Sequence, residues 1–257
     1  MPAPYLAFDQ VSKRFGELPV ITPINLAIAR NEIVVFLGPS GCGKTTLMRM
    51  AGGLDRPSQG IIRLAGEPVG GPDRRRGMVF QAYSSFPWLT VADNVAYGMR
   101  YRGDLTAPQK QERVAHYLAL VGLTEFAASF PKRISGGMRQ RVAIARTLAA
   151  GSEVLLMDEP FGALDAQTRE HLQTQLRAIQ RQDAKTIIFV THDVEEALFI
   201  ADRVIVFSKR PARIIAEIDI AARFGPERTL ELRETKPFFD LRNEVLRQVR
   251  SEVGVNV

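Results

Sequence analysis

The sequence has little cysteine and no long apolar run, the features typical of secreted and membrane-spanning chains. Cys42 is its single cysteine, so no internal disulfide can form and nothing indicates an oxidising compartment. No stretch approaches the roughly 20 uninterrupted apolar residues that span a bilayer, and residues 1–4 are not the basic start of an apolar segment. We therefore expect a cytosolic chain whose contact with a membrane is made through partners.

The composition is otherwise that of a soluble domain, with 46% hydrophobic and 24% charged residues among 257. The formal net charge of +6 would suit nucleic-acid binding, but basic residues cluster weakly and the densest run, residues 74–76, is short. A solvated surface, or a face near anionic lipid, explains the charge as well. Composition excludes a disordered or disulfide-rich chain, and the motifs must indicate the function.

Apolar runs predict a parallel sheet covered by helices. Residues 33–37, 154–157 and 187–190 are continuous β-favouring runs, which is typical of strands buried on both faces. A helical pattern over 166–182 joins the second run to the third, and strand, helix, strand is the connection of parallel strands. Ahead of this core, short runs at 5–8 and 24–28, separated by Gly16 and Pro19, predict antiparallel strands.

The segment between the first two buried strands predicts mainly helix. Thr106 and Gln109 form a capping-box start and Gly122 supplies a stop, while a second helix is expected from Arg139 to Ala149. Further strands are expected at 204–207 and 214–218. Beyond Pro237, apolar residues recur at helical spacing and predict a terminal amphipathic helix.

The segment from Gly38 to Thr45 fits the pattern G-x-x-x-x-G-K-[ST] and lies between a buried strand and a helix starting at Lys44. In such a loop, backbone N–H groups surround the β-phosphate, Lys44 reaches the β- and γ-phosphates, and Thr45 binds Mg²⁺. Cys42 lies inside the loop, where a small side chain is tolerated. The sequence therefore predicts a site for a nucleoside triphosphate.

Two carboxylates, Asp158 and Glu159, follow the second buried strand, at the sheet edge where ligands bind. Alone, an Asp-Glu pair is equally compatible with a surface turn. Combined with the phosphate loop it predicts hydrolysis, with Asp158 holding Mg²⁺ through water and Glu159 polarising the attacking water.

The residues around these motifs identify a family resemblance. Residues 134–141, Ile-Ser-Gly-Gly-Met-Arg-Gln-Arg, resemble the signature sequence of ABC transporter ATP-binding subunits. Gln81 resembles the Q-loop glutamine, residues 163–165 the D-loop, and His192 the switch histidine, all in the family's order. The resemblance covers residues 5 to about 208.

The resemblance implies an α/β fold: a P-loop NTPase (RecA-like) core with an antiparallel β subdomain, residues 1–82 and 151–208. A helical signature subdomain, residues 83–150, is inserted into it, and residues 209–257 form an extension with a strand and an amphipathic helix. About 50 residues are too few for an independent regulatory domain of ordinary size.

The resemblance also implies a head-to-tail homodimer with each ATP between one subunit's phosphate loop and the other's signature. A helix amino terminus at Ser135 is an anion site that only the partner's γ-phosphate can fill. Lys44, Gln81, Glu159 and the γ-phosphate sensor His192 would act in catalysis, and Thr45, Gln81 and Asp158 would bind Mg²⁺. The nucleotide would contact Phe15, Gly38, Pro39, Ser40, Gly41, Cys42, Gly43, Lys44, Thr45, Thr46, Ser135, Gly136, Gly137 and Asp165.

Two positions depart from the family pattern. Met138 replaces the signature's usual final glutamine, so we expect weakened affinity or altered coupling with hydrolysis intact. Phe15 best matches the aromatic residue that stacks on adenine, and its alternative is an ordinary core phenylalanine. His116 and His171 lie on predicted helix faces without companion ligands and are interpreted as surface residues.

The segment from Phe80 to Val91, with its Pro-Trp-Leu-Thr-Val, resembles the nitrate, sulfonate and taurine importer branch, as do residues 209–214. This implies two membrane permease subunits and, indirectly, a substrate-binding protein, with the chain peripheral on the cytoplasmic face of the inner membrane. Residues 83–88 offer anchors for a permease helix, although Phe86 alone fits an internal cluster equally well. Alternatives are another importer, an export or lipid system, or a soluble ABC ATPase acting on nucleic acid; direct nucleic-acid binding is not expected.

Overall fold

The computed structural model describes residues 4–80 and 85–253, and it divides the chain into two compact units. One unit comprises residues 1–73 and 176–257, and the other comprises residues 74–175. Helix α5 (Ala166–Asp183) contributes residues to both. This division groups the strand before Asp158 with the helical segment, whereas the expected subdomain boundaries of 83 and 150 stay a prediction.

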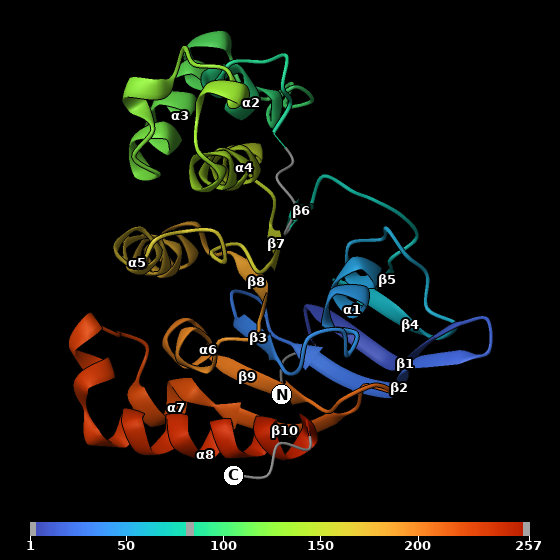
Figure 1. The fold of residues 1–257 in the computed structure, drawn as a ribbon. Helices are drawn as coiled ribbons and strands as arrows, with labels where there is room; N and C mark the ends of the chain where they lie inside the picture. The colour runs from blue at the N-terminus through green and yellow to red at the C-terminus, as the bar shows by residue number, and fades with distance from the viewer. Residues whose placement is uncertain (1–3, 81–84, 254–257) are drawn as a thin grey trace. The chain divides into compact units, whose positions relative to one another are not determined.

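The first unit contains an antiparallel sheet of order β2-β1-β4-β5, in which β1 and β2 are blue and β4 is cyan in Figure 1. Its strands are β1 (Leu6–Phe15), β2 (Leu18–Ile28), β4 (Gln59–Leu64) and β5 (Glu67–Pro68). The predicted antiparallel pair is confirmed, with Leu6 opposite Ile28. Pro19, which the sequence places between strands, lies inside β2 instead, near the strand's start, where a missing N–H is tolerated.

The same unit holds the strands that carry the phosphate loop. Strands lie in the order β10-β9-β3-β8, with β3 parallel to both of its neighbours and β10 antiparallel to β9. Their bounds are β3 (Ile33–Leu37), β8 (Thr186–Thr191), β9 (Arg203–Phe207) and β10 (Ile214–Asp219). All residues of β3 and β8 are buried, so the prediction of strands covered on both faces is confirmed.

Helices of this unit follow the strands along the chain. They are α1 (Lys44–Ala51), α6 (Val194–Ile200), α7 (Ile220–Phe224), the short 3₁₀ helix η3 (Leu230–Glu234) and α8 (Lys236–Val253). The terminal helix predicted beyond Pro237 is confirmed as α8, which packs against α6 (Figure 1). Phe238, Leu241 and Val245 of α8 are buried, as the helical spacing of its apolar residues requires.

Two buried arginines join the carboxyl-terminal extension to the end of α6. Arg228 donates to the carbonyls of Phe199 and Ala201, and Arg177 donates to the carbonyls of Ile200 and Pro226. Burial, reinforced by the neighbouring Arg177 charge, lowers the pKa of Arg228 to about 10. Because cations are favourable at a helix carboxyl terminus, both guanidinium groups remain compatible with the interior.

The second unit pairs β6 (Arg76–Val79) with β7 (Val154–Asp158) in parallel and gathers helices beyond them (Figure 1). The helices are α2 (Val91–Tyr97), α3 (Ala107–Leu120), η1 (Thr124–Phe126), η2 (Pro131–Arg133) and α4 (Gly136–Ala150). The capping box predicted at Thr106 is confirmed: its N–H donates to Gln109 Oε1 at 2.8 Å. Helix α4 begins at Gly136, before the predicted Arg139, because Ser135 caps it.

Candidate ATP site

The phosphate loop runs from the end of β3 to the start of α1, within the first unit. A Cβ atom at Gly38 would lie 2.8 Å from the carbonyl oxygen of Phe207, so only glycine fits there. Gly43 precedes α1 and supplies no side-chain cap. The first N–H groups of this helix are thus not covered by a capping side chain, which is the arrangement that binds phosphate.

Lys44 is buried, with 5% of its surface exposed, and its ammonium group lies within the loop. Nζ donates to the carbonyl oxygens of Gly38 at 2.7 Å and Pro39 at 2.8 Å, and lies 3.9 Å from Cys42 Sγ. The ammonium group is therefore held by the loop's own oxygens, where phosphate oxygens, which carry more charge, can replace them. Thr45, the candidate Mg²⁺ ligand, is exposed and Thr46 is half-buried.

His192 follows the strand next to the one that precedes the phosphate loop. Leu37, the last residue of β3, pairs with Thr191 of β8, so the loop and His192 leave the same edge of the sheet. His192 is exposed. The neighbouring Asp193 caps α6 by accepting N–H bonds from Glu195 at 2.9 Å and Glu196 at 3.1 Å, which fixes the turn that presents the imidazole.

Phe15 ends β1 and is 52% exposed, so the structure does not make it a core residue. The ammonium nitrogen of Lys13 lies 4.9 Å from the centroid of its ring. An exposed aromatic face beside a cation is a suitable surface for a nucleotide base. Its assignment to adenine stacking stays a prediction.

In the second unit, β7 ends at Asp158 and places Glu159 at the turn that follows. Asp158 is buried, with 5% exposed, and Glu159 is half-buried. Glu159 has φ of +45°, a conformation that costs a residue with a Cβ atom about 1–3 kcal/mol. Glu159 therefore stands at a strained turn, and such backbone strain is more common at functional sites than in surface turns.

The signature segment forms the amino terminus of α4, within the same unit. Ser135 is exposed, and its Oγ accepts a hydrogen bond from the Met138 N–H at 3.2 Å. Gly136 and Gly137 are the next residues of the helix. A Cβ atom at Gly137 would lie 3.2 Å from the Ala163 carbonyl oxygen, so glycine permits the signature to approach the loop after β7 closely.

Asp165 stands at the start of α5 and has a structural partner. Its Oδ1 accepts the Thr168 N–H at 2.9 Å, and this bond, with one from the Thr168 hydroxyl, lowers the pKa of Asp165 below its ordinary value. The Arg141 guanidinium adds a smaller electrostatic contribution of the same sign. Asp165 is therefore an anionic helix cap at neutral pH, and its contact with the nucleotide stays a prediction.

The predicted site residues are divided between the two units. The phosphate loop, Phe15 and His192 belong to one unit, and Asp158, Glu159, Ser135 and Asp165 belong to the other. Gln81 and Tyr83 lie outside the described residues. His116 and His171 are exposed on helices, as expected of surface residues.

Sequence reasoning missed one residue beside the phosphate loop. Arg210, on the loop between β9 and β10, donates from Nη2 to the Gly41 carbonyl oxygen at 2.7 Å. The two residues are 169 positions apart. The sequence distinguishes this segment only by the resemblance of residues 209–214 to one importer branch. No local pattern could have predicted the contact.

The strand–loop–helix around Lys44, together with the strand that ends at Asp158, defines a P-loop NTPase. Residues 21–162 match the family model described as ABC transporter, and the chain belongs to the ABC transporter family. Its fold and ATPase activity are those of an ABC ATP-binding subunit, as predicted. No helix among residues 4–80 and 85–253 combines the length and apolar character needed to cross a membrane.

Named relatives extend this assignment. The nitrate import ATP-binding protein NrtD of Synechocystis is 44% identical over 239 residues, which cover 91% of this chain and 89% of NrtD. The taurine import ATP-binding protein TauB of Jannaschia is 43% identical, with 94% and 92% covered. A dimeric post-hydrolysis structure of the ATP-binding cassette MJ0796 with ADP and Pi is 32% identical and has a TM-score of 0.75, with 84% of this chain and 98% of that chain covered.

Cys42 provides a test of the loop's placement. Its surface is 2% exposed, so an alkylating reagent should modify the folded chain slowly. We expect the added group to block nucleotide binding by filling the loop, and ATP to protect. Labelling is measured by intact mass and binding by calorimetry, with Cys42→Ala as a reagent-insensitive control. Full ATPase activity after complete labelling would contradict the placement.

Proposed function

We propose that two copies of this chain bind two ATP molecules between them and power the import of a small solute. The observation that carries the proposal is the signature segment, where the exposed Ser135 caps α4 and two half-buried glycines begin the helix. This helix terminus is suited to an anion, and the γ-phosphate held by the partner's phosphate loop has the required charge. The dimeric form of the MJ0796 relative supports this arrangement.

The donor types at Thr45 and Asp158 suit a magnesium ion that would be shared with ATP. Thr45 offers a hydroxyl oxygen and Asp158 a carboxylate, both hard donors of the kind that Mg²⁺ prefers. Among the described residues, no group of three or more His, Cys, Asp or Glu side chains forms a metal site. Phosphate oxygens and water would therefore complete the coordination, as is usual for Mg²⁺. The ion would neutralise charge on the β- and γ-phosphates.

In this proposal each protein group has one task. Lys44 binds the β- and γ-phosphates, Glu159 accepts hydrogen bonds from the attacking water, and His192 contacts the γ-phosphate. Gln81 contributes to Mg²⁺ binding, and Phe15 stacks on adenine. Hydrolysis removes the phosphate shared by the two subunits, which allows them to separate and delivers movement to the membrane.

Two permease subunits would dock on the second unit, at the segment that begins with Phe86. Asn94 is fully buried and fixes this segment, because its Oδ1 accepts the Phe86 N–H at 2.7 Å and its amide donates to three carbonyls. Phe86 itself is half-buried, with its ring centroid 4.6 Å from that of Tyr97. Trp88, in contrast, is 70% exposed and is the available anchor.

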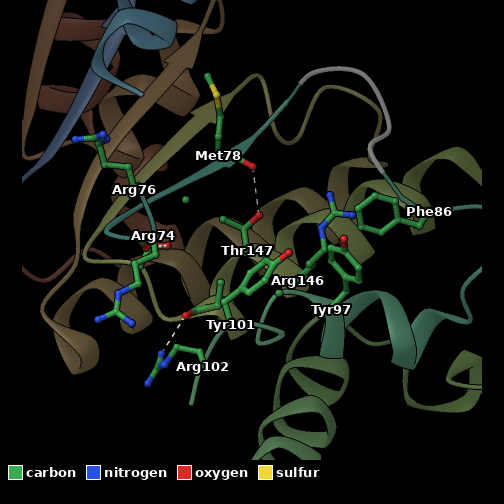
Figure 2. A pocket seen from close by; sticks show the side chains of 13 residues that line it. Arg74, Arg76, Met78, Phe86, Tyr97, Tyr101, Arg102, Arg146 and Thr147 are labelled. Atoms are coloured by element: carbon green, nitrogen blue, oxygen red, sulfur yellow. Dashed lines mark hydrogen bonds between the residues drawn. The ribbon is translucent and has the colours of Figure 1, made fainter. Parts of the chain in front are cut away.

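A cavity of about 390 Å³ lies beside this segment, and its lining includes Arg74, Arg76, Arg102 and Arg146, of which Arg102 forms an ion pair with Asp104 at 2.6 Å. Figure 2 shows Arg146 against Phe86 and Tyr97, with its guanidinium carbon 4.8 Å from the Phe86 centroid. Burial lowers the pKa of Arg146. A permease helix with an apolar residue for Trp88 and an acidic residue near this basic cavity would complement the surface.

The relatives that import nitrate and taurine support a small oxyanion of the nitrate, sulfonate or taurine type as the transported solute. A separate substrate-binding protein would deliver it, and the chain would work at the cytoplasmic face of the inner membrane. Substrate choice would reside in those partners. Uptake of radiolabelled solute by the reconstituted complex tests this assignment.

Co-purification tests the partner. Tagged chain recovered from detergent-solubilised membranes should bring apolar permease subunits, identified by mass spectrometry, and Trp88→Ala should reduce their recovery about tenfold. Phe239→Ala, which removes an exposed aromatic residue from α8, is the matched control and should leave recovery unchanged. Equal recovery with Trp88→Ala would refute this docking site. Salt-sensitive recovery of nucleic acid in place of membrane proteins would favour the nucleic-acid alternative.

A further inference from the structure

The loop between β9 and β10 is held against β2 at a defined position. The Ala212 N–H donates to the Val20 carbonyl at 2.8 Å, and the Ala212 carbonyl accepts from the Thr22 N–H at 3.0 Å. Ser208 Oγ closes the loop by donating to Lys209 O and accepting the Arg213 N–H at 3.1 Å. These hydrogen bonds fix the conformation of the loop and its position on β2.

The end of β9 and the loop that follows it contact the phosphate loop at two points. A Cβ atom at Gly38 would lie 2.8 Å from the carbonyl oxygen of Phe207, the last residue of β9. The second point is the Arg210 guanidinium, whose Nη2 donates to the Gly41 carbonyl at 2.7 Å. The contacts lie at Gly38, the first residue of the phosphate loop, and at Gly41, near its middle.

The second contact constrains the peptide group between Gly41 and Cys42. In a trans peptide the carbonyl and the N–H point in opposite directions, so a carbonyl held by Arg210 directs the Cys42 N–H the other way. That N–H points to Pro39 O at 3.4 Å, the same oxygen that Lys44 Nζ contacts at 2.8 Å. Gly41 has φ of +74°, and glycine rotates readily, so an external bond is useful to prevent the peptide from turning over.

We propose that Arg210 is a positioning residue that sets the affinity for ATP by holding the Gly41 carbonyl outside the phosphate loop. A phosphate group is attracted by an inward N–H and repelled by an inward carbonyl. Without Arg210, the peptide group can turn so that the Gly41 carbonyl points inward. The inference rests on the proposed binding of ATP at this loop, and it gives the extension that starts at residue 209 a physical link to the nucleotide.

Arg210→Ala should raise the Kd and the KM for ATP about 3- to 10-fold, the loss expected for one hydrogen bond, with kcat at saturating ATP unchanged within about twofold. Arg210→Lys, which keeps the charge and a donor, should recover part of the affinity. Lys209→Ala removes an equal charge from the neighbouring position and is the matched control. Binding is measured by calorimetry and turnover by phosphate release.

An unchanged Kd in Arg210→Ala would overturn the proposal, and so would an equal rise in Lys209→Ala, because that result would indicate a general field effect. If Arg210→Ala fails to fold, Arg210→Met, which keeps the aliphatic stem and has no donor, decides by the same comparison with Lys209→Ala. Proton–nitrogen NMR adds a direct readout, because the Cys42 amide resonance should shift in Arg210→Ala and stay in place in Lys209→Ala. Wild-type chain without measurable ATP affinity would refute the proposed function itself.

Discussion

Replacement of Glu159 by glutamine is expected to lower kcat for ATP hydrolysis by about 10²- to 10⁴-fold and to trap an ATP-bound dimer. Glutamine preserves the size of the side chain and removes its charge, and a positioned general base contributes a factor of about this size. ATP binding should persist, because Lys44 and the phosphate loop are unchanged. Phosphate release measures kcat, and light scattering with size-exclusion chromatography measures the dimer.

Glu125→Gln is the matched control, since it makes the same chemical change at an exposed position of η1 in the same unit. It should keep wild-type turnover. Near-normal kcat in Glu159→Gln would remove Glu159 from its role, and a monomer at saturating ATP would refute the shared γ-phosphate.

The backbone at Glu159 sharpens this experiment. Because φ is +45° there, Glu159→Gly should relieve strain and raise thermal stability while it also loses turnover. Glu159→Gln retains the Cβ atom and should leave the melting temperature nearly unchanged. Opposite changes in stability and activity would identify a conformation kept for function.

Replacement of Lys44 by alanine is expected to abolish productive ATP binding. The ammonium group is the buried cation of the loop, held within 2.8 Å of two carbonyl oxygens, and no other lysine or arginine is placed in the described residues 38–45. Without it the phosphates would face those carbonyls with no charge to balance them. Calorimetry with ATP measures the loss of affinity, which should exceed that of Arg210→Ala.

Lys132→Ala, at an exposed lysine of η2, controls for the change in net charge and should bind ATP normally. Lys44→Met distinguishes lost charge from a cavity, because methionine fills the buried stem of the side chain. Tight ATP binding in either Lys44 variant would count against the assignment of this loop.

The elements that the sequence predicted well are those built from neighbouring residues. Helix α1 starts at Lys44 as expected, and α5 begins at Ala166 as expected, because helical periodicity and breakers act locally. Strand β4, at Gln59–Leu64, was not predicted. Its partner lies in β1, more than 40 residues earlier, and a short strand of mixed polarity carries little local signal.

The same distinction separates the parts of the candidate site. The glycines and lysine of the phosphate loop form a continuous segment whose mechanism depends on adjacent backbone N–H groups, so their role could be predicted from residue types alone. The exposure of Phe15 and the positive φ of Glu159 could not be predicted in this way, since both depend on how distant segments pack around a turn.

By itself the sequence determined the class of protein and the residues nearest to the phosphates, because a nucleotide loop is a local device. Only the tertiary structure decided that Arg210 touches Gly41, that Asn94 holds the segment before Trp88 in place and that Arg228 joins the extension to α6. Each of these is a hydrogen bond to a backbone group, which every residue possesses. The type of residue that supplies the backbone group therefore does not indicate the contact, and folding alone selects it.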